Sequence, residues 1–288
     1  MSAMLWMVAG GPGAMVWEPI ALAQAQSNPD AAVNWVNRGL GLIQEGQISE
    51  AIAAFERATQ LAPSLAAAHY NLGLALRQDG QLQAAADAFY RATQADPTFA
   101  LAFANLGAAL LEGNNLQQSR DYLQQALQLE PTMGLAHYNL GLIFKQEESW
   151  NEAIGAFRAS ITYSPNAPEP PYHLGLIYLE LGQIPDAKAA FEEAIAKRSN
   201  YAEAHYHLGL ILYNQQDYNA ALNAFRSAAE SNSNYANAYY GAGLVFLRQG
   251  EVGEAQRVLE YAKELYRIQG NGEQAQSVER LLERSRNP

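Results

Sequence analysis

A glycine returns every 34 residues along this chain, seven times, with no insertion or deletion between copies. A small residue lies twelve positions after each glycine, a Phe or Leu lies four further on, and a second small residue lies three beyond that. Self-similarity at a period of roughly 20–50 residues indicates an array of stacked supersecondary units. The chain is therefore expected to be a repeat array, although its 288 residues alone would suggest about two ordinary domains. The glycines are Gly39, Gly73, Gly107, Gly141, Gly175, Gly209 and Gly243.

Each repeat is predicted to form two helices. Apolar residues at helical spacing, such as Leu72 and Leu76, predict the first helix. Its end is marked in four units by a glycine, because a residue in the left-handed region is favoured there. The recurring stripe of small residue, Phe and small residue predicts the second helix, which a proline ends in the first four units. These glycines are Gly46, Gly80, Gly182 and Gly250, and the prolines are Pro63, Pro97, Pro131 and Pro165.

The repeated residues resemble the tetratricopeptide repeat (TPR) family over residues 32–269. The second unit shows the family pattern as Tyr70-Asn71-Leu72-Gly73, followed by Ala85, Phe89, Ala92 and Pro97. The resemblance implies an all-α fold, a right-handed α-α superhelix with a concave groove, in which each unit packs against its neighbours. Val278, Leu281 and Leu282 share one side of a further helix predicted at 273–286, which we interpret as a C-terminal cap.

The predicted domain organisation has three parts. Residues 1–29 form a leader, residues 30–269 contain the seven TPR units, and residues 270–288 form the capping helix and tail. The units are 32–65, 66–99, 100–133, 134–167, 168–201, 202–235 and 236–269.

The leader resembles a targeting segment. It contains one charged residue, Glu18, and an apolar stretch from Leu5 to Trp17. Ala21-Leu22-Ala23 follows it, a small-x-small pattern typical of signal-peptide cleavage. A basic start is missing, and the stretch is shorter than the roughly 20 residues that span a bilayer. The apolar leader with its Ala-x-Ala ending nevertheless favours export, and we expect a periplasm or thylakoid lumen as its destination. Membrane attachment through residues 1–23 stays open, as does a cytoplasmic location if the start is misassigned.

Composition excludes several classes of function. Acidic residues outnumber basic ones, 29 to 18, and the net charge of −11 argues against nucleic-acid binding. The absence of cysteine excludes disulfides, thiolate metal sites and cysteine nucleophiles. The sequence also lacks a phosphate-binding glycine loop, a Gly-x-Ser-x-Gly elbow and a His-Glu-x-x-His motif. We therefore expect that the chain is not an enzyme and binds no cofactor.

The candidate binding residues lie on the first helix of each unit. Positions are numbered within each unit from its first residue, so that the recurring glycine is position 8. Positions 2, 5, 6, 9, 12 and 13 fall on the side of the first helix opposite the packed side, and in the TPR family that side lines the groove. The candidates are Asn37, Asn71, Asn105 and Asn139 at position 6, Tyr70, Tyr138, Tyr172, Tyr206 and Tyr240 at position 5, Leu74 and Leu142 at position 9, and Arg77 and Lys145 at position 12.

These residues indicate two modes of binding. The asparagines form a ladder whose carboxamides could pair with the backbone of a bound peptide, although local hydrogen bonding of an asparagine that is common in TPRs explains them equally well. The tyrosine and leucine rows favour a hydrophobic segment or an amphipathic helix. We expect the leucines to be partly buried and the tyrosines to be exposed. Positions 2, 5 and 6 hold no Lys or Arg, which argues against the carboxylate clamp of co-chaperone TPRs.

A metal site is a weaker alternative. Glu169 with His173, and Glu203 with His207, repeat a spacing of four residues, and these residue types bind divalent metals. A helix-stabilising pair explains the same spacing and is favoured. His207 would be the ligand to test for metal-dependent stabilisation.

The leading functional hypothesis is a non-catalytic scaffold that holds a peptide or helix of a client protein in its groove. The leader and the Gln- and Ala-rich units are similar in style to exported or thylakoid TPR factors of cyanobacteria. That similarity implies an assembly or interaction factor for photosynthetic or pigment-synthesis proteins. The alternatives are a self-assembling solenoid, hence a homo-oligomer, and a divalent-metal carrier.

Overall fold

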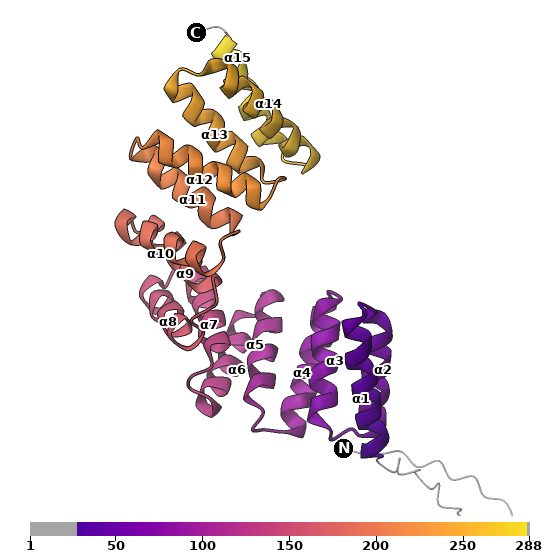
Figure 1. Ribbon diagram of the computed structural model, residues 1–288. Coiled ribbons are helices and arrows are strands. Elements are labelled where there is room, and N and C mark those ends of the chain that lie inside the picture. The colour runs from indigo at the N-terminus through magenta and orange to yellow at the C-terminus, as the bar shows by residue number, and fades with distance from the viewer. Residues whose placement is uncertain (1–27, 287–288) are drawn as a thin grey trace, which may run out of the picture.

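The computed structural model describes residues 28–286, which form fifteen α-helices and no strand. Consecutive helices pack as pairs, and the pairs stack into a curved superhelix (Figure 1). The predicted right-handed α-α superhelix with a C-terminal capping helix is confirmed. The helices are α1 (Pro29–Gln44), α2 (Ile48–Leu61), α3 (Ala66–Gln78), α4 (Leu82–Ala95), α5 (Ala100–Glu112), α6 (Leu116–Leu129), α7 (Gly134–Gln146), α8 (Trp150–Tyr163), α9 (Glu169–Glu180), α10 (Ile184–Lys197), α11 (Ala202–Asn214), α12 (Tyr218–Ser231), α13 (Ala236–Gln249), α14 (Val252–Ile268) and α15 (Gly272–Arg286).

The recurring glycine lets the two helices of a unit touch. A Cβ atom on Gly175 of α9 would lie 2.6 Å from Cε1 of Phe191 in α10, closer than non-bonded carbons approach. Phe191 is completely buried. The glycines at position 8 of the other six units meet the Phe or Leu at position 24 in the same way. The periodicity of glycine and aromatic residue therefore records a close contact between the paired helices.

The turn between the paired helices has the same conformation in all seven units. Position 15 lies in the left-handed region in each, at φ between 56° and 81°. Gly46, Gly80, Gly182 and Gly250 occupy it in four units, which confirms the predicted end of the first helix. The other three units place Asn114, Glu148 and Gln216 there. A side chain in this conformation is strained, so the turn geometry comes from the packing of the helices.

The two ends of the array are built differently from its middle. Arg38 of α1 is exposed where the next five units have a leucine, and its guanidinium carbon lies 4.9 Å from the centre of the Trp35 ring. At the other end, α15 covers α14. Val278 and Leu282 of α15 are almost fully buried in one cluster with Tyr266 of α14. The helix α15 therefore closes the apolar face that α14 would otherwise leave open.

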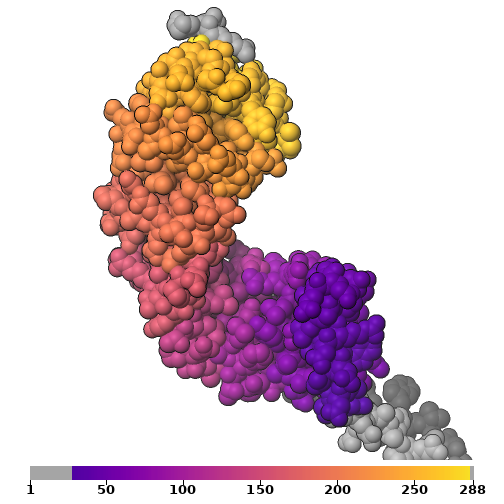
Figure 2. Space-filling model, viewed as in Figure 1, coloured from indigo at the N-terminus to yellow at the C-terminus, as the bar shows by residue number. Residues whose placement is uncertain are grey.

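The curvature gives the molecule a hollowed side. The helices α1 to α6 stack along one direction, and the stack turns through α7–α10 toward α15 (Figure 1). The space-filling view shows the resulting hollow between the N-terminal and C-terminal units (Figure 2). Between residues 28 and 286, no helix combines the length and hydropathy needed to cross a bilayer. The predicted leader lies almost wholly outside the described residues.

Candidate functional site

The first half of the array exposes apolar side chains on its first helices. Five of these side chains expose between 36% and 45% of their area and occupy positions 2 and 9 of the first four units. We call them the apolar row. Exposed apolar side chains grouped on one face of a protein are candidates for an interaction surface. The row consists of Val33, Leu40, Leu74, Leu101 and Leu135.

The asparagine ladder bonds mostly to its own helices. The side chains of Asn71, Asn105 and Asn139 donate to the carbonyl oxygens four residues earlier, at 2.7, 2.9 and 3.0 Å. Asn105 and Asn139 are only 5% and 6% exposed. Asn105 also donates to the hydroxyl of Tyr70, at 3.3 Å. Asn37 is exposed and Asn71 is partly exposed, so a bound backbone could reach these two.

The tyrosines at position 5 are partly buried, and the expectation that they are exposed is wrong. Each of the first four packs against the Phe at position 24 of its own unit, with ring centres 5.8 to 6.0 Å apart. Burial raises the pKa of Tyr138 to about 12. In units 1 and 2 the leucines at position 9, Leu40 and Leu74, are exposed instead. The tyrosine rings thus contribute to the contact between paired helices, which the position on the first helix does not reveal.

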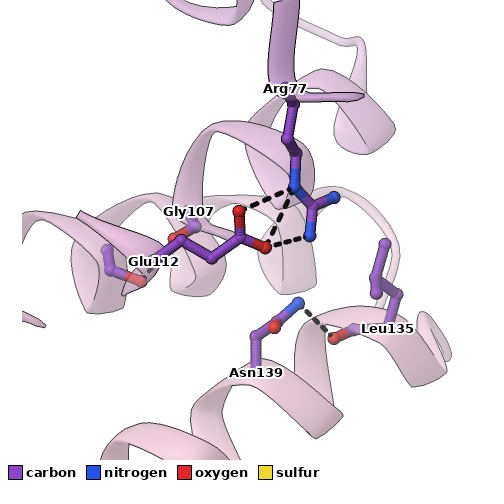
Figure 3. Close-up of polar contacts among 6 residues, drawn as sticks. Arg77, Gly107, Glu112, Leu135 and Asn139 are labelled. Atoms are coloured by element: carbon purple, nitrogen blue, oxygen red, sulfur yellow. Dashed lines mark hydrogen bonds and ion pairs between the residues drawn. The ribbon is translucent and has the colours of Figure 1, made fainter. Parts of the chain in front are cut away.

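The two predicted groove cations differ in their partners. Arg77 of α3 donates through Nε to Glu112 of α5, at 3.0 Å to Oε1, and its Nη2 also contacts this carboxylate (Figure 3). The same view shows the side chain of Asn139 of α7 donating to the carbonyl oxygen of Leu135. Lys145 of α7 forms no ion pair with any described residue, and partial burial lowers its pKa. The ion pair connects two neighbouring units, whereas Lys145 keeps its charge available.

The pairs of Glu and His do not form a metal centre in this structure. The Glu169 carboxylate lies 3.2 Å from Nη1 of Arg198. The ring of His173 stacks on Phe157, with centres 5.4 Å apart, and the ring of His207 stacks on Phe191 at 5.2 Å. Burial lowers the pKa of both histidines to about 4. Nowhere in residues 28–286 do three or more His, Cys, Asp or Glu lie close enough together to hold a metal ion.

Sequence reasoning missed a second set of tyrosines in the C-terminal half. Tyr201 and Tyr235 hold position 34, just before the first helix of the next unit. The ring of Tyr201 lies 4.9 Å from that of Tyr172, and the ring of Tyr235 lies 5.5 Å from that of Tyr206. Their spacing of 34 residues was the available signal, since the first three units have Leu65, Phe99 and Met133 at that position.

The paired helices, the glycine contact and the apolar row define a solenoid of helical hairpins that exposes apolar side chains on its first helices. A model of the tetratricopeptide repeat family matches residues 36–98, 105–168 and 172–222, and a TPR repeat model matches residues 209–250. These matches cover more than half of the chain, and the protein belongs to the tetratricopeptide repeat family. Members of this family are generally non-catalytic scaffolds for protein interactions.

Solved structures share the fold. A chain of the APC/C hetero-tetramer Cut9–Hcn1 matches with a TM-score of 0.66 and 19% identity, over 76% of this chain and 43% of that one. PilF of Pseudomonas aeruginosa matches with a TM-score of 0.64 and 19% identity, over 73% of this chain and 95% of the PilF chain. YrrB, described as a TPR protein with an unusual peptide-binding site, matches with a TM-score of 0.53 and 23% identity, over 67% of this chain and 99% of the YrrB chain. No curated protein matches the sequence.

Proposed function

We propose that this protein is a non-catalytic adaptor that binds a segment of a protein partner on its concave face. The apolar row carries the proposal. Its five side chains stand at position 2 or position 9 of four consecutive first helices, and these two positions lie on one side of the helix, so the row follows the array. Burying apolar area yields roughly 25 cal/mol per Å², and exposed leucines in register offer such area to a partner. A peptide-binding site in the structurally similar YrrB supports this use of the fold.

The chemistry of the row defines the partner coarsely. Neighbouring helices lie about 8–10 Å apart, so an extended segment or an amphipathic helix can place apolar side chains against successive units. Asn37 and Asn71 adjoin the row and can bond to the backbone of such a segment. A role in assembling photosynthetic or pigment-synthesis proteins rests on the leader and the composition of the units, and an exported or membrane-attached location rests on the leader; both stay predictions.

Site-specific crosslinking tests the proposal. A photoreactive amino acid replaces Leu74 in the apolar row of the full-length chain, and illumination follows in an extract of the native organism. The matched control places the same group at Leu129, which is 43% exposed at the end of the second helix α6. We expect adducts with another protein at Leu74 and not at Leu129.

Two other outcomes contradict this adaptor model. Adducts at Leu129 alone would move the interface to the second helices. Adducts at Leu74 whose mass equals two copies of the chain would establish self-assembly instead. In the expected case, the variant Leu74→Glu, Leu101→Glu loses the partner, because two carboxylates then stand where apolar side chains should be buried.

A further inference from the structure

The fifth unit contains a cation site that the chain fills with its own arginine. Glu169 holds position 2, Arg198 position 31 and Tyr201 position 34. Nη1 of Arg198 lies 3.2 Å from Oε1 of Glu169, and the guanidinium carbon lies 3.8 Å from the centre of the Tyr201 ring. The guanidinium is thus paired with a carboxylate and stacked on an aromatic face, an arrangement that suits arginine better than lysine.

In the seventh unit, too, the polar side chain at position 2 bonds to another residue of the chain. Tyr266 at position 31 donates its hydroxyl to Oδ1 of Asn237 at position 2. Units five and seven therefore share one arrangement, in which the residue at position 31 bonds to the polar side chain at position 2.

The sixth unit has the residues of unit five at positions 2 and 34 but lacks the cation at position 31. Glu203 stands at position 2 and Tyr235 at position 34, each 34 residues after its counterpart in unit five. Position 31 holds Asn232, whose Oδ1 accepts from the backbone N–H of Asn234 at 3.0 Å. Glu203 forms no ion pair or side-chain hydrogen bond with any residue between 28 and 286. The carboxylate is left without the partner that its counterpart has.

The aromatic residue of the unit-five arrangement is also present in unit six, where Tyr235 holds the position of Tyr201 and its ring centre lies 5.5 Å from that of Tyr206. Burial raises the pKa of Tyr235 to about 12, and the nearby charge of Glu203 adds to this effect. Burial and then the same charge raise the pKa of Tyr172. The rings of Tyr172 and Tyr201 are tilted to each other with centres 4.9 Å apart, and burial raises the pKa of Tyr201, with the charge of Glu203 adding a smaller effect. We call Glu203, Tyr172, Tyr201 and Tyr235 the Glu203 site.

A structural role explains only part of this site. Glu203 lies in the first turn of α11, where the helix dipole stabilises a carboxylate. The dipole accounts for the acidic residue but not for the tyrosine at position 34, nor for the absence of the cation that the preceding unit supplies.

We propose that the Glu203 site binds an arginine side chain of the partner segment, whose guanidinium takes the place that Arg198 takes in unit five. This inference rests on the proposed function, because the arginine belongs to a segment on the concave face. Charge complementarity favours it, since the chain carries a net charge of −11. The partner thus combines apolar residues for units one to four with an arginine for unit six.

Peptide selection tests the inference. Short random peptides displayed on phage are selected against the full-length chain, and enriched peptides are synthesised and titrated by fluorescence anisotropy. We expect the enriched peptides to contain arginine. Glu203→Gln should weaken their binding about tenfold, as expected for a cation–π contact combined with an ion pair. The matched control is Glu230→Gln on the exposed side of α12, which removes the same charge from the same unit and should leave affinity unchanged.

A second variant fills the Glu203 site with an arginine of the chain itself. Asn232→Arg gives unit six the same three residues as unit five, so we expect an internal guanidinium to pair with Glu203 and to weaken the peptide as Glu203→Gln does. Enriched peptides without arginine, or equal affinity in wild type and Glu203→Gln, would overturn the inference and leave the adaptor function standing. Failure to enrich any peptide would overturn the adaptor function as well.

Discussion

At the scale of single residues, one hydrogen atom at position 8 decides how closely two helices pack. Gly175→Ala would place a methyl group 2.6 Å from the buried Phe191 ring, so we expect a loss of about 1–3 kcal/mol from overpacking. Gly155 in α8 has no atom within 4 Å of the position its Cβ would take. Gly155→Ala should therefore gain about 0.5–1 kcal/mol, because alanine loses less backbone entropy in a helix. Urea unfolding followed by circular dichroism measures the free energy of unfolding of both variants. A gain in stability in both would contradict the packing argument.

The histidines at position 6 make stability depend on pH. The pKa of His173 and of His207 is about 4 in the folded protein and 6.5 when unperturbed. Below pH 6.5 the unfolded chain takes up protons that the folded chain refuses, so these groups lower stability between pH 6.5 and 4. The charge of Lys145 adds to the effect at His173, whereas that of Glu203 opposes it at His207.

The double variant His173→Asn, His207→Asn isolates this contribution. Asparagine is the residue that units one to four carry at position 6. We expect the double variant to lose less stability than the wild type when the pH falls from 6.5 to 4, in urea titrations at each pH. Carboxylates titrate in the same window in both proteins, so the difference between them is informative. Parallel losses would show that the histidines are not buried in neutral form.

The residues that recur in each repeat predict contacts inside a unit better than they predict which side chains are exposed. Glycine and Phe at fixed spacing predicted correctly where the core lies, because both residues pack inside one helix pair. The asparagine and tyrosine rows were harder to interpret. Their exposure depends on how the next unit stacks, and Asn105 is buried whereas Asn37 at the same position is exposed.

At the scale of elements, the turn between paired helices tolerates residues that it does not favour. Gln216 lies between α11 and α12 at φ 65°, where a side chain costs about 1–2 kcal/mol. We expect Gln216→Gly to stabilise the protein by about 0.5–1 kcal/mol after the entropy that glycine loses. Asn114→Gly should gain less, because asparagine tolerates this conformation. Gly182→Gln should lose stability. Melting temperatures should be highest for Gln216→Gly, lower for Asn114→Gly and lowest for Gly182→Gln. A lower melting temperature in Gln216→Gly than in the wild type would contradict the strain assigned to this turn.

Helix ends were predictable where a local signal sets them. Glycine at position 15 ends the first helices, since its conformation is a property of one residue. The start of α1 has no such signal: the first repeat unit begins at Ala32, but the helix begins at Pro29. The side chain of Asn28 accepts from the backbone N–H of Ala31 at 3.0 Å, and this cap extends the helix before the first unit. A cap unique to one end cannot be found by comparing repeats.

At the scale of the whole molecule, the concave face has two halves of different chemistry. The first four units expose the apolar row, whereas units five and six carry Glu169 and Glu203 at position 2 with tyrosines beside them. The repeat frame could predict the seven units but not this division, since the variable positions carry it. A partner that occupies both halves must match them in order, which gives the array a direction of binding.

The array should also respond locally to damage at its ends, because each unit packs mainly against its neighbours. Leu282 of α15 is completely buried against α14, and Leu282→Ala should cost about 2–5 kcal/mol where that contact is made. Hydrogen exchange read by mass spectrometry is then expected to quicken in α13, α14 and α15 and to stay unchanged in α1 to α6. The partly buried neighbour Leu281 supplies the control, since Leu281→Ala removes fewer contacts and should have a smaller effect in the same helices. Equal acceleration in all fifteen helices between residues 28 and 286 would mean instead that the solenoid unfolds as one cooperative unit, and that α15 stabilises the distant apolar row as much as its own end.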